Sequence, residues 1–316
     1  KHRYSNAEGR DLWNSIGKIA HKPVDSMMKT WIDQVGYPVV DVKRNNSNIS
    51  LTQRRFLSDG SRASKNRWAI PIQVEEGNHQ NSILMKSRTA VVSLKNKDSN
   101  FIINSDRYGF YRVQYDDHSL AKLSLLIDEK ILNHVDRWGL QNDLFSQCVS
   151  GTKHLQEYFD FTTSYHDEDD YITLLNLAQN LYYIYKLTIK EKFTDEVHTY
   201  TAQFLGSIFD RLGWDSRKNE KHTDSLLRSF VITALGKLGD KEILSEANKR
   251  FNKFLKNKNS LAADLQEPVF VLAAWQGDKK TYNRLLSLYR KSTLQEEKIR
   301  FLMAMCNFKQ KNLLLK

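Results

Sequence analysis

The stretch that marks the change of fold along this chain is Trp31-Ile32-Asp33-Gln34-Val35-Gly36-Tyr37-Pro38-Val39-Val40-Asp41-Val42. Before Gly36 the apolar side chains recur at helical spacing, and Gly36 with Pro38 forms a combination that ends a helix. After Pro38 the valines are residues that favour an extended strand. The stretch therefore predicts a helix that gives way to a strand.

The residues before this stretch predict two short helices. Leu12, Ile16 and Ile19 share one helical face, and Pro23 is placed to open a second helix that contains Trp31. We expect residues 1–36 to form a short helical lead-in before the strands.

The residues after it predict a small β-sandwich over 37–116. Short runs of β-branched and aromatic residues alternate with polar ones and are separated by turn residues. Pro71 lies inside one run, and it indicates an edge strand or a bulge because proline cannot donate a ladder hydrogen bond. The predicted strands cover 39–42, 49–56, 68–74, 82–86, 90–94, 101–104 and 110–115.

Residues 117–316 predict an irregular, HEAT-like α-helical array. No proline occurs between Pro71 and Pro268, and apolar residues recur three and four apart. Short connections between helices favour stacked antiparallel pairs, and no repeat of fixed length is visible. The predicted fold is therefore a multidomain α+β chain: a short helical lead-in, a β-sandwich and a helical array that we expect to be incomplete.

Composition excludes several other classes of protein. The chain has 316 residues, of which 27% are charged, and its net charge is +11. Residues 1–117 carry +7 of this charge and the longer remainder carries +4, so no long basic surface is predicted. No apolar run is long enough to span a bilayer. Cys148 and Cys306 are the two cysteines, which mildly favours a reducing compartment, and we expect a cytoplasmic protein.

Several short motifs, in order, resemble one family. They are Tyr4-x-Asn6-Ala7 with Asp11-Leu12-Trp13, residues 31–42, Gln53-x-x-Phe56, Trp68-x-Ile70-Pro71, Gly109-Phe110-Tyr111-Arg112-Val113-x-Tyr115, Asp136-Arg137 with Asn142-Asp143, Leu212-Gly213-Trp214 with Leu227-Arg228, and residues 261–269. The sequence resembles the zinc aminopeptidases, which include aminopeptidase N, the endoplasmic-reticulum aminopeptidases and the archaeal tricorn-interacting aminopeptidases. The resemblance implies an enzyme that removes N-terminal residues from peptides, and it implies that residues 1–36 are the last helices of its catalytic domain.

The family's zinc motif, His-Glu-x-x-His, is absent from this sequence. Two histidines four apart on a helix can share one metal ion, and the glutamate between them can activate its water. None of the nine histidines is followed by glutamate, and none has a histidine four residues later. We therefore expect a C-terminal segment without catalytic residues or a metal site. Zinc would belong to the parent enzyme, and the upstream catalytic domain and the peptide substrate would be the partners.

The resemblance also points to residues that would touch a peptide inside a closed cavity. Tyr185 and Lys186 resemble an aromatic–lysine segment that faces this cavity in vertebrate relatives. A lysine beside a tyrosine hydroxyl can hold a carboxylate through charge-assisted hydrogen bonds. The alternative is a helix with a buried tyrosine face and a lysine that reaches to solvent. For Arg228 the alternative to a peptide contact is an ion pair with an aspartate of its own domain.

Other residues are predicted to be structural. We expect Arg112, in the strand that ends the sandwich, to bridge to the helical domain through its forked donors. Trp31, Tyr37, Asp136 and Arg137 are also predicted to hold domains together. In the acidic run 166–170, a metal cluster and a solvated, helix-capping loop are both conceivable, and we favour the loop because adjacent acids rarely converge on one ion.

Two functions of other classes compete with this interpretation. A sandwich joined to a helical array is also a general protein-interaction scaffold, since fold does not fix function. Nucleic-acid binding would use the basic residues of the first third, but no RNA-binding aromatic motif accompanies them. Those basic residues are Arg54, Arg55, Arg62, Lys65 and Arg67.

Overall fold

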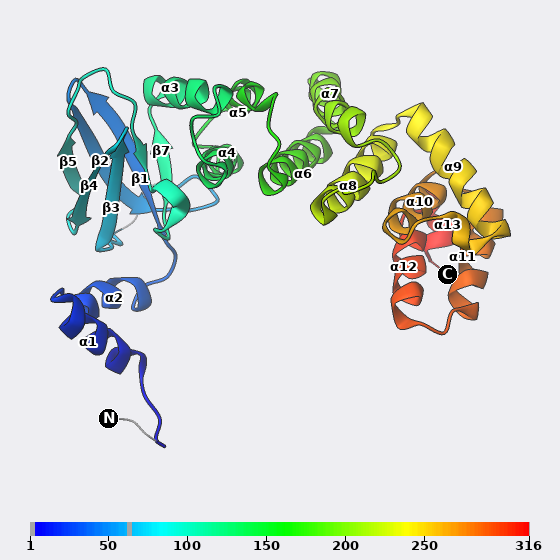
Figure 1. The fold of residues 1–316 in the computed structure, drawn as a ribbon, viewed down its shortest axis with the longest axis horizontal. Helices are drawn as coiled ribbons and strands as arrows, with labels where there is room; N and C mark the ends of the chain where they lie inside the picture. Colours follow the sequence, from blue (N-terminus) through cyan, green and yellow to red (C-terminus); the bar gives the residue numbers. More distant parts are fainter. Residues whose placement is uncertain (1–3, 62–64, 316) are drawn as a thin grey trace. The chain divides into compact units, whose positions relative to one another are not determined.

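The structure is a computed structural model that describes residues 4–61 and 65–315. It divides into two compact units, Lys1–Thr173 and Leu174–Lys316, and each is described here by itself (Figure 1). The first unit contains every strand of the described chain and the second is helical throughout. The α+β fold that the sequence predicts is thereby confirmed. The three predicted domains, 1–36, 37–116 and 117–316, are a different division of the chain and stay a prediction.

The first unit begins with the two predicted helices, α1 (Gly9–Ala20) and α2 (Val24–Ile32). Glu8 and Asp11 form a reciprocal capping box at the start of α1. Pro23 is the N-cap of α2. Proline has no backbone N–H, and none is needed at the start of a helix. After Gly36, which has a φ of 88°, the chain enters the first strand. The change from helix to strand therefore falls inside the stretch where the sequence predicts it.

In the part of the chain that the structure describes, seven strands form two sheets that make up the sandwich (Figure 1). One sheet has the order β5-β2-β1-β7 and the other β4-β3-β6. The pairing of β1 with β7 is parallel, and the remaining pairs are antiparallel. The strands are β1 (Pro38–Asn45), β2 (Asn48–Arg55), β3 (Ile70–Glu76), β4 (His79–Met85), β5 (Thr89–Ser93), β6 (Ile102–Ile103) and β7 (Arg112–Tyr115).

The sandwich core consists of the apolar side chains that alternate along the strands. Ile49 and Leu51 on β2 and Ile70 and Ile72 on β3 are almost fully buried. Pro71 lies on β3, which is the middle strand of its sheet, so it is not on an edge strand. β3 pairs with β4 along its whole length but with β6 only at Val74 and Glu75. One side of β3 is thus unpaired at Pro71, and no ladder bond is lost.

A buried glutamine joins the two sheets. Gln53 on β2 is fully buried; its side-chain amide donates to the carbonyl of Trp68 at 2.9 Å and accepts from the Trp68 N–H at 2.8 Å. Trp68 precedes β3 in the other sheet. Because a buried amide is costly unless it is bonded, this reciprocal pair fixes Gln53 and the entry of β3 together.

The helices that follow the sandwich in the first unit are α3, α4 and α5. A short 3-10 turn, η1 (Ser105–Arg107), lies between β6 and β7, and another, η2 (Thr163–Tyr165), follows α5. The helix N-caps are the residues that favour this role, with Asp116 before α3 and Asn133 before α4. The bounds are α3 (Asp117–Asp128), α4 (His134–Val149) and α5 (Leu155–Thr162).

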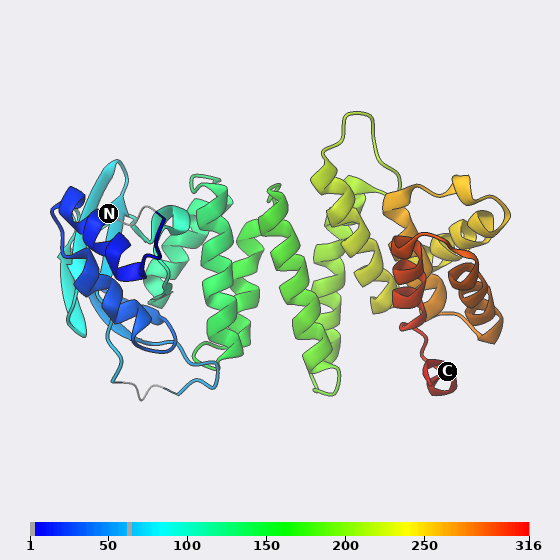
Figure 2. The ribbon, with the colours of Figure 1, turned by 90° about the horizontal axis from the view of Figure 1, so that it is seen from below.

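The second unit is an irregular array of helices. α6 (Tyr171–Thr188) crosses from one unit to the next, and the remaining helices pack in pairs such as α7 with α8 and α11 with α12 (Figures 1 and 2). They are α7 (Thr194–Leu212), α8 (His222–Leu238), α9 (Lys241–Lys256), α10 (Ala263–Trp275), α11 (Lys279–Lys291), α12 (Gln295–Met305) and α13 (Lys311–Leu314), with the 3-10 turn η3 (Lys258–Ser260).

Helix α10 is the centre of the second unit. It packs against α8, α9 and α12, and its residues from Pro268 to Ala274 are all buried. Phe270 lies between Phe254 of α9 and Phe301 of α12, with ring centroids 4.8 and 5.1 Å away. The array is therefore held by an apolar core built around one nearly all-buried helix. Within residues 4–61 and 65–315, every helix falls short of the length and apolar character that crossing a bilayer would require.

Candidate functional site

The predicted contact residues Tyr185 and Lys186 lie in the last turn of α6. The ring of Tyr185 is half-buried and meets the ring of His198 on α7 edge-on, with 5.5 Å between centroids. Lys186 is exposed, and its ammonium group lies over the rings of Tyr182 at 5.2 Å and Tyr183 at 5.8 Å. Lys186 is thus supported by aromatic faces, which attract a cation through their π electrons.

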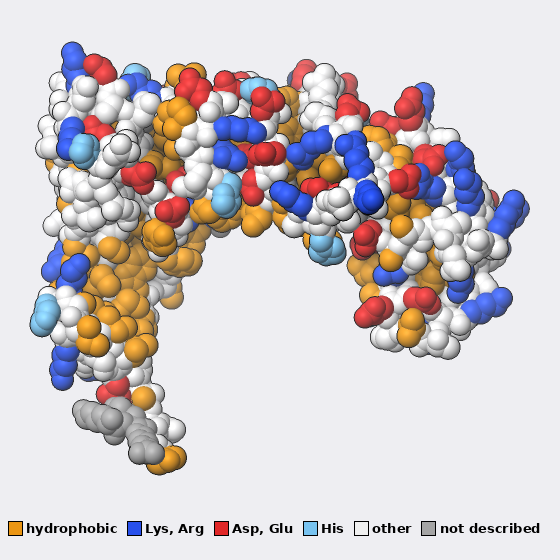
Figure 3. Space-filling model, viewed as in Figure 1, with side chains coloured by type: hydrophobic (Ala, Val, Ile, Leu, Met, Phe, Trp, Pro, Cys, Tyr) orange, Lys and Arg blue, Asp and Glu red, His pale blue; other side chains and the backbone are white. Residues whose placement is uncertain are grey.

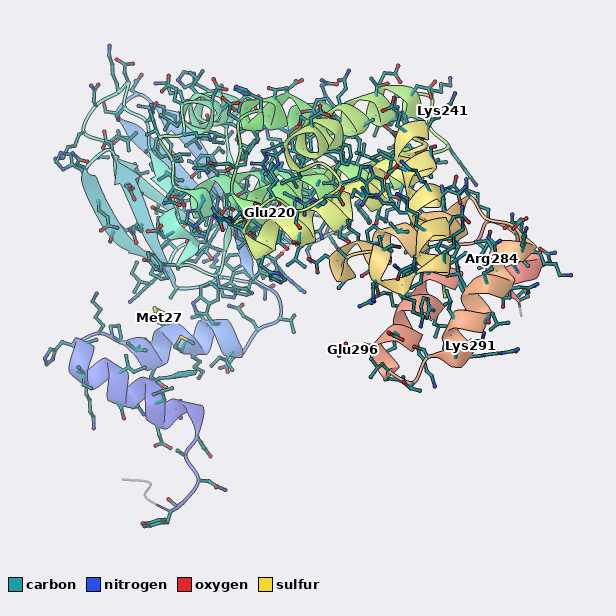
Figure 4. The ribbon with its side chains drawn as sticks, turned by 45° about the vertical axis from the view of Figure 1, so that its right-hand side comes forward. Met27, Glu220, Lys241, Arg284, Lys291 and Glu296 are labelled. Carbon is teal, nitrogen blue, oxygen red and sulfur yellow. The ribbon has the colours of Figure 1, made fainter. Side chains whose placement is uncertain are left out.

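Arg228 of α8 is placed differently, because only 2% of its side chain is exposed. Its guanidinium donates to the carbonyls of Leu212 and Gly213 and to Glu220, at 3.2, 3.1 and 2.5 Å. Glu220 lies beside α8 in Figure 4. The hydrogen bond from Arg228 holds the pKa of the Glu220 carboxyl below its usual value. These bonds hold the connection between α7 and α8 in place. The alternative to a peptide contact was an ion pair between Arg228 and an aspartate, and the acid in the structure is Glu220.

Three residues that the sequence interpretation did not single out extend the basic surface around Lys186. Lys237 of α8 and Lys309, after α12, both lie over the ring of Trp275, at 5.6 and 4.3 Å from its centroid. Lys237 also donates to the Asn307 side chain at 2.7 Å. We call Tyr182, Lys186, Lys237, Trp275 and Lys309 the lysine–aromatic cluster. No periodic signal in the sequence links these positions, because they come from four separate segments.

Charge sets this cluster apart from the ion pairs elsewhere in the molecule. Burial lowers the pKa of Lys237, and the nearby charge of Lys186 lowers it further. Among the described residues, no carboxylate forms an ion pair with Lys186, Lys237 or Lys309. Cations held close together without acids repel one another, so an anion that binds there relieves the repulsion. Lysines without acidic partners that lie over aromatic rings are chemically suited to bind an anion.

In the first unit, Arg112 reaches from β7 to helix α4. Its guanidinium donates to Asp143 at 3.0 Å, to the Asn142 carbonyl at 3.3 Å and to the Tyr37 hydroxyl at 3.2 Å. The Tyr37 ring stacks on Phe56, with 5.4 Å between centroids. These contacts are those expected of an arginine that bridges the sandwich and helix α4. The contribution of Arg112 to stability stays a prediction.

Asp143 is the acceptor around which this bridge is built. Its side chain is 8% exposed, and it also accepts from Arg107 at 2.7 Å and from the Val113 N–H at 3.1 Å. Gly139 on α4 leaves room for Arg107, since a Cβ there would lie 1.7 Å from the arginine Nε. Beside these residues is a pocket of about 340 Å³, which Tyr37 and Phe110 also line.

The other predicted structural residues are also bonded inside the first unit. Trp31 donates its indole N–H to the Ala69 carbonyl at 3.1 Å, which ties α2 to the start of β3. Asp136 is buried and accepts from the Asp106 N–H at 2.8 Å. Burial raises the pKa of the Asp136 carboxyl despite this bond. Helix α2 also turns Met27 toward the sheets (Figure 4).

Arg137 corrects one expectation about the acidic run 166–170. Its guanidinium makes two bonds of 2.7 Å to Glu168, whose side chain is 1% exposed. Glu168 is therefore a buried ion-pair partner and not part of a solvated loop. The reason is that Arg137 offers a forked donor that matches a carboxylate, which outweighs the preference of an isolated acid for water. Asp170 does cap α6, since it accepts from the Thr173 N–H at 3.0 Å.

The basic residues proposed for nucleic-acid binding do not form one free surface. Arg54 is 9% exposed and is bonded to Asp41 at 2.8 Å and to Gln114 at 2.7 Å. Arg62 lies outside the described residues. Across the described residues, no three His, Cys, Asp or Glu side chains come together in a way that could hold a metal ion.

Comparison with known proteins agrees with the resemblance seen in the sequence. The family model described as the ERAP1-like C-terminal domain matches residues 100–316. Aminopeptidase M1 of Arabidopsis thaliana is 33% identical over 95% of this chain. A probable aminopeptidase 2 of Sulfurisphaera tokodaii is 31% identical over 98%, and the tricorn protease-interacting factor F2 of Thermoplasma volcanium is 29% identical over 96%. The chain spans 36–37% of the length of these three relatives.

Proposed function

The chain belongs to the ERAP1-like C-terminal domain family, and from this premise we propose that it is the non-catalytic C-terminal segment of a zinc aminopeptidase. The observation that carries the proposal is that relatives named aminopeptidases match almost the whole chain while the chain covers little more than a third of each. The zinc site and the catalytic residues would lie in the part of the parent protein upstream of this segment.

The first two helices support an upstream partner within the same protein. No residue of α1 or α2 is buried in the described structure. On α1, Leu12 is 60% exposed and Ile19 is 83% exposed. Figure 3 shows hydrophobic side chains gathered near these helices. An apolar helix face normally packs against another element, so residues 1–36 would complete the helices of the catalytic domain, with 37–116 as the sandwich and 117–316 as the helical domain.

The lysine–aromatic cluster supports a role in holding the peptide. Lys186 is exposed and lies over two tyrosine rings, so its ammonium group is free to bond a carboxylate. Tyr185 directly precedes Lys186 on the same helical turn. Arg228 is also a predicted peptide contact, but its guanidinium donates to backbone carbonyls in the connection between α7 and α8. This favours a role in supporting that connection and not in touching the peptide. The helical domain would enclose the peptide, and the distance from the zinc to the cluster would set a length preference as the enzyme closes.

The test is aminopeptidase activity on an aminoacyl fluorogenic substrate. The 316-residue chain is compared with the same chain extended upstream in its gene, both with added zinc. We expect activity in the extended chain and none in the shorter one. Activity in the 316-residue chain would contradict the proposal, because the described residues contain no metal-binding group.

An interaction scaffold is the alternative function. A sandwich followed by stacked helices is a common protein-binding architecture. An upstream gene sequence without His-Glu-x-x-His, or an inactive extended chain that is correctly folded, would favour this alternative.

A further inference from the structure

The cations of the second unit are concentrated in two segments of the chain. Residues 249–258, in α9 and η3, and residues 279–291, in α11, together contain ten Lys and Arg and no Asp or Glu. Figure 3 shows Lys and Arg gathered over α9 and α11. We call these ten residues the basic face. The overall charge conceals this face, because residues 118–316 carry only +4 in total.

A side-chain contact joins the two segments of the basic face. Arg284 of α11 donates to the side chain of Asn252 of α9 at 3.4 Å. Asn252 shares one side of α9 with Lys249 and Lys256, since residues three and four apart on a helix are neighbours. Lys291 lies two turns after Arg284 on α11 (Figure 4). The cations of both helices therefore adjoin on one surface.

Most of the basic face has no acidic partner. Lys249 and Arg250 pair with Glu246 at 3.1 and 2.8 Å, and Arg250 also pairs with Asp215 at 2.6 Å. Among the residues that the structure describes, the other eight cations of the face form no ion pair. Like charges held together repel one another and destabilise the folded chain, and a bound polyanion would relieve this repulsion.

Helix dipoles explain only part of this arrangement. The last turns of α9 and α11 each carry two cations, where they interact favourably with the negative end of the helix dipole. Lys279 and Lys280 are instead the first two residues of α11, at the positive end of its dipole, where a cation is unfavourable. The stability of α11 therefore gives no reason for these two lysines.

The basic face offers charge but little apolar surface. From residue 241 to residue 291 no large apolar side chain is exposed, and α9 and α11 pack against α10 and α12. A protein partner is normally held by buried aromatic and aliphatic side chains, and single-stranded nucleic acid by exposed aromatic rings. An anionic bilayer surface needs neither, because lysines attract its headgroups without insertion of apolar side chains.

The kind of cation also favours a lipid surface. Seven of the ten residues are lysines and three are arginines. The ammonium group of lysine is a point charge on a flexible stem, whereas the forked guanidinium of arginine suits a ligand of fixed geometry. Lipid headgroups are mobile and present no fixed pattern of acceptors, so flexible point charges match them.

We propose that the basic face binds the surface of an anionic lipid bilayer. The sides of α9 and α11 that carry the lysines lie against the headgroups, and the apolar sides of both helices stay in the protein core. The binding is peripheral and electrostatic. This inference goes beyond the proposed function and does not depend on it, since it requires neither a peptide nor zinc.

Cosedimentation of the 316-residue chain with lipid vesicles tests the proposal. One set of vesicles is phosphatidylcholine alone, and the other contains about one third phosphatidylserine. We expect the anionic vesicles to bind on the order of a hundredfold more tightly at low salt, because each lysine near such a surface contributes about a factor of five. The difference is expected to disappear at high salt, since exposed charges are screened.

Substitutions locate the effect on the basic face. Changing Lys279→Gln and Lys280→Gln together is expected to weaken binding to the anionic vesicles roughly tenfold. The fold should tolerate this change, because it removes two cations from the positive end of a helix. Lys190→Gln with Lys192→Gln is the matched control: both lysines are exposed in the connection between α6 and α7, outside the basic face. The control is expected to bind like the unaltered chain.

Three results would overturn the inference. The first is equal binding to neutral and anionic vesicles at low salt. The second is anionic binding that the Lys279 and Lys280 substitutions reduce no more than the control does. The third is displacement of the chain from the vesicles by a short nucleic-acid duplex at equal phosphate concentration, which would assign the face to a polynucleotide. None of them would affect the proposed function, which the aminopeptidase assay tests separately.

Discussion

Different kinds of interaction hold the elements together inside each of the two compact units. In Lys1–Thr173, buried charged side chains join elements of unlike type: Arg112 and Arg107 on Asp143 connect β7 and η1 to α4, and Arg137 binds Glu168. In Leu174–Lys316, helices meet helices, and the centre is a group of phenylalanines around Phe270.

The difference follows from geometry. Helices of one array can interdigitate their side chains, so dispersion and burial are sufficient to hold them. A strand end and a helix present backbone groups and side chains at different spacings, and directional bonds from a forked guanidinium fix their relation better than apolar contact does. The junction between the sandwich and α4 in the first unit therefore depends on bonds that can be removed one at a time, and the packing of α10 in the second unit depends on packed volume.

The largest expected effect concerns the apolar centre of the second unit. Phe270→Ala removes a fully buried ring and is expected to lower the free energy of unfolding by about 3–5 kcal/mol. Urea denaturation followed by circular dichroism measures this. Leu302→Ala, at a position that is 47% exposed on α12, is the control and is expected to cost far less. A small effect of Phe270→Ala would mean that the array does not depend on this centre.

Asp143→Ala tests the charged interior of the first unit. It leaves Arg107 and Arg112 without their carboxylate in a site that is largely buried, and we expect a loss of about 3 kcal/mol. The same denaturation experiment applies, with the exposed Asp210→Ala as the matched control. If Asp143→Ala were as harmless as its control, the contrast between the two units would be wrong.

Arg112→Ala is expected to be milder, at about 2 kcal/mol, because Arg107 stays on Asp143 and the side chain of Arg112 is 22% exposed. Its loss removes three hydrogen bonds and the contact with the Tyr37 ring. Thermal unfolding measures the change. An unaltered melting temperature would show that the bridge contributes nothing to stability.

The smallest effect concerns Lys237 and depends on pH. Its folded-state pKa lies below the ordinary value of 10.5, so the unfolded chain binds more protons and the wild type gains stability as pH rises toward 10.5. Lys237→Met removes this dependence. Urea denaturation at several pH values should therefore show the wild type gaining on Lys237→Met from neutral pH up to 10.5. Parallel pH profiles for the two proteins would contradict the lowered pKa.

Local patterns predicted most of the secondary structure. The recurrence of apolar residues reports one face of a strand or helix, and the turn residues report its ends, so early strands followed by a helical array could be predicted without tertiary information. Pro71 shows the limit of this reasoning. It indicated an edge strand or a bulge, whereas β3 is a middle strand with a short neighbour, and only the sheet order reveals the unpaired side.

The site was less predictable than the fold. The resemblance selected Tyr185, Lys186 and Arg228. It could not show that Lys186 is exposed whereas Arg228 bonds backbone carbonyls in the connection between α7 and α8. It also passed over Lys237 and Lys309, because a single lysine carries no periodic pattern or motif. Glu168 was missed for the same reason, since its burial depends on Arg137 some thirty residues earlier.

The sequence by itself determined the order of the elements, the change from helix to strand at 31–42, the lack of a zinc motif and the family to which the chain belongs. The tertiary structure decided which charges are neutralised. Periodicity and motifs are properties of neighbouring residues, whereas an ion pair or an unpaired cluster depends on side chains brought together from distant segments. That is why Asp143 with its two arginines, and the lysines around Trp275, became visible only in the folded chain.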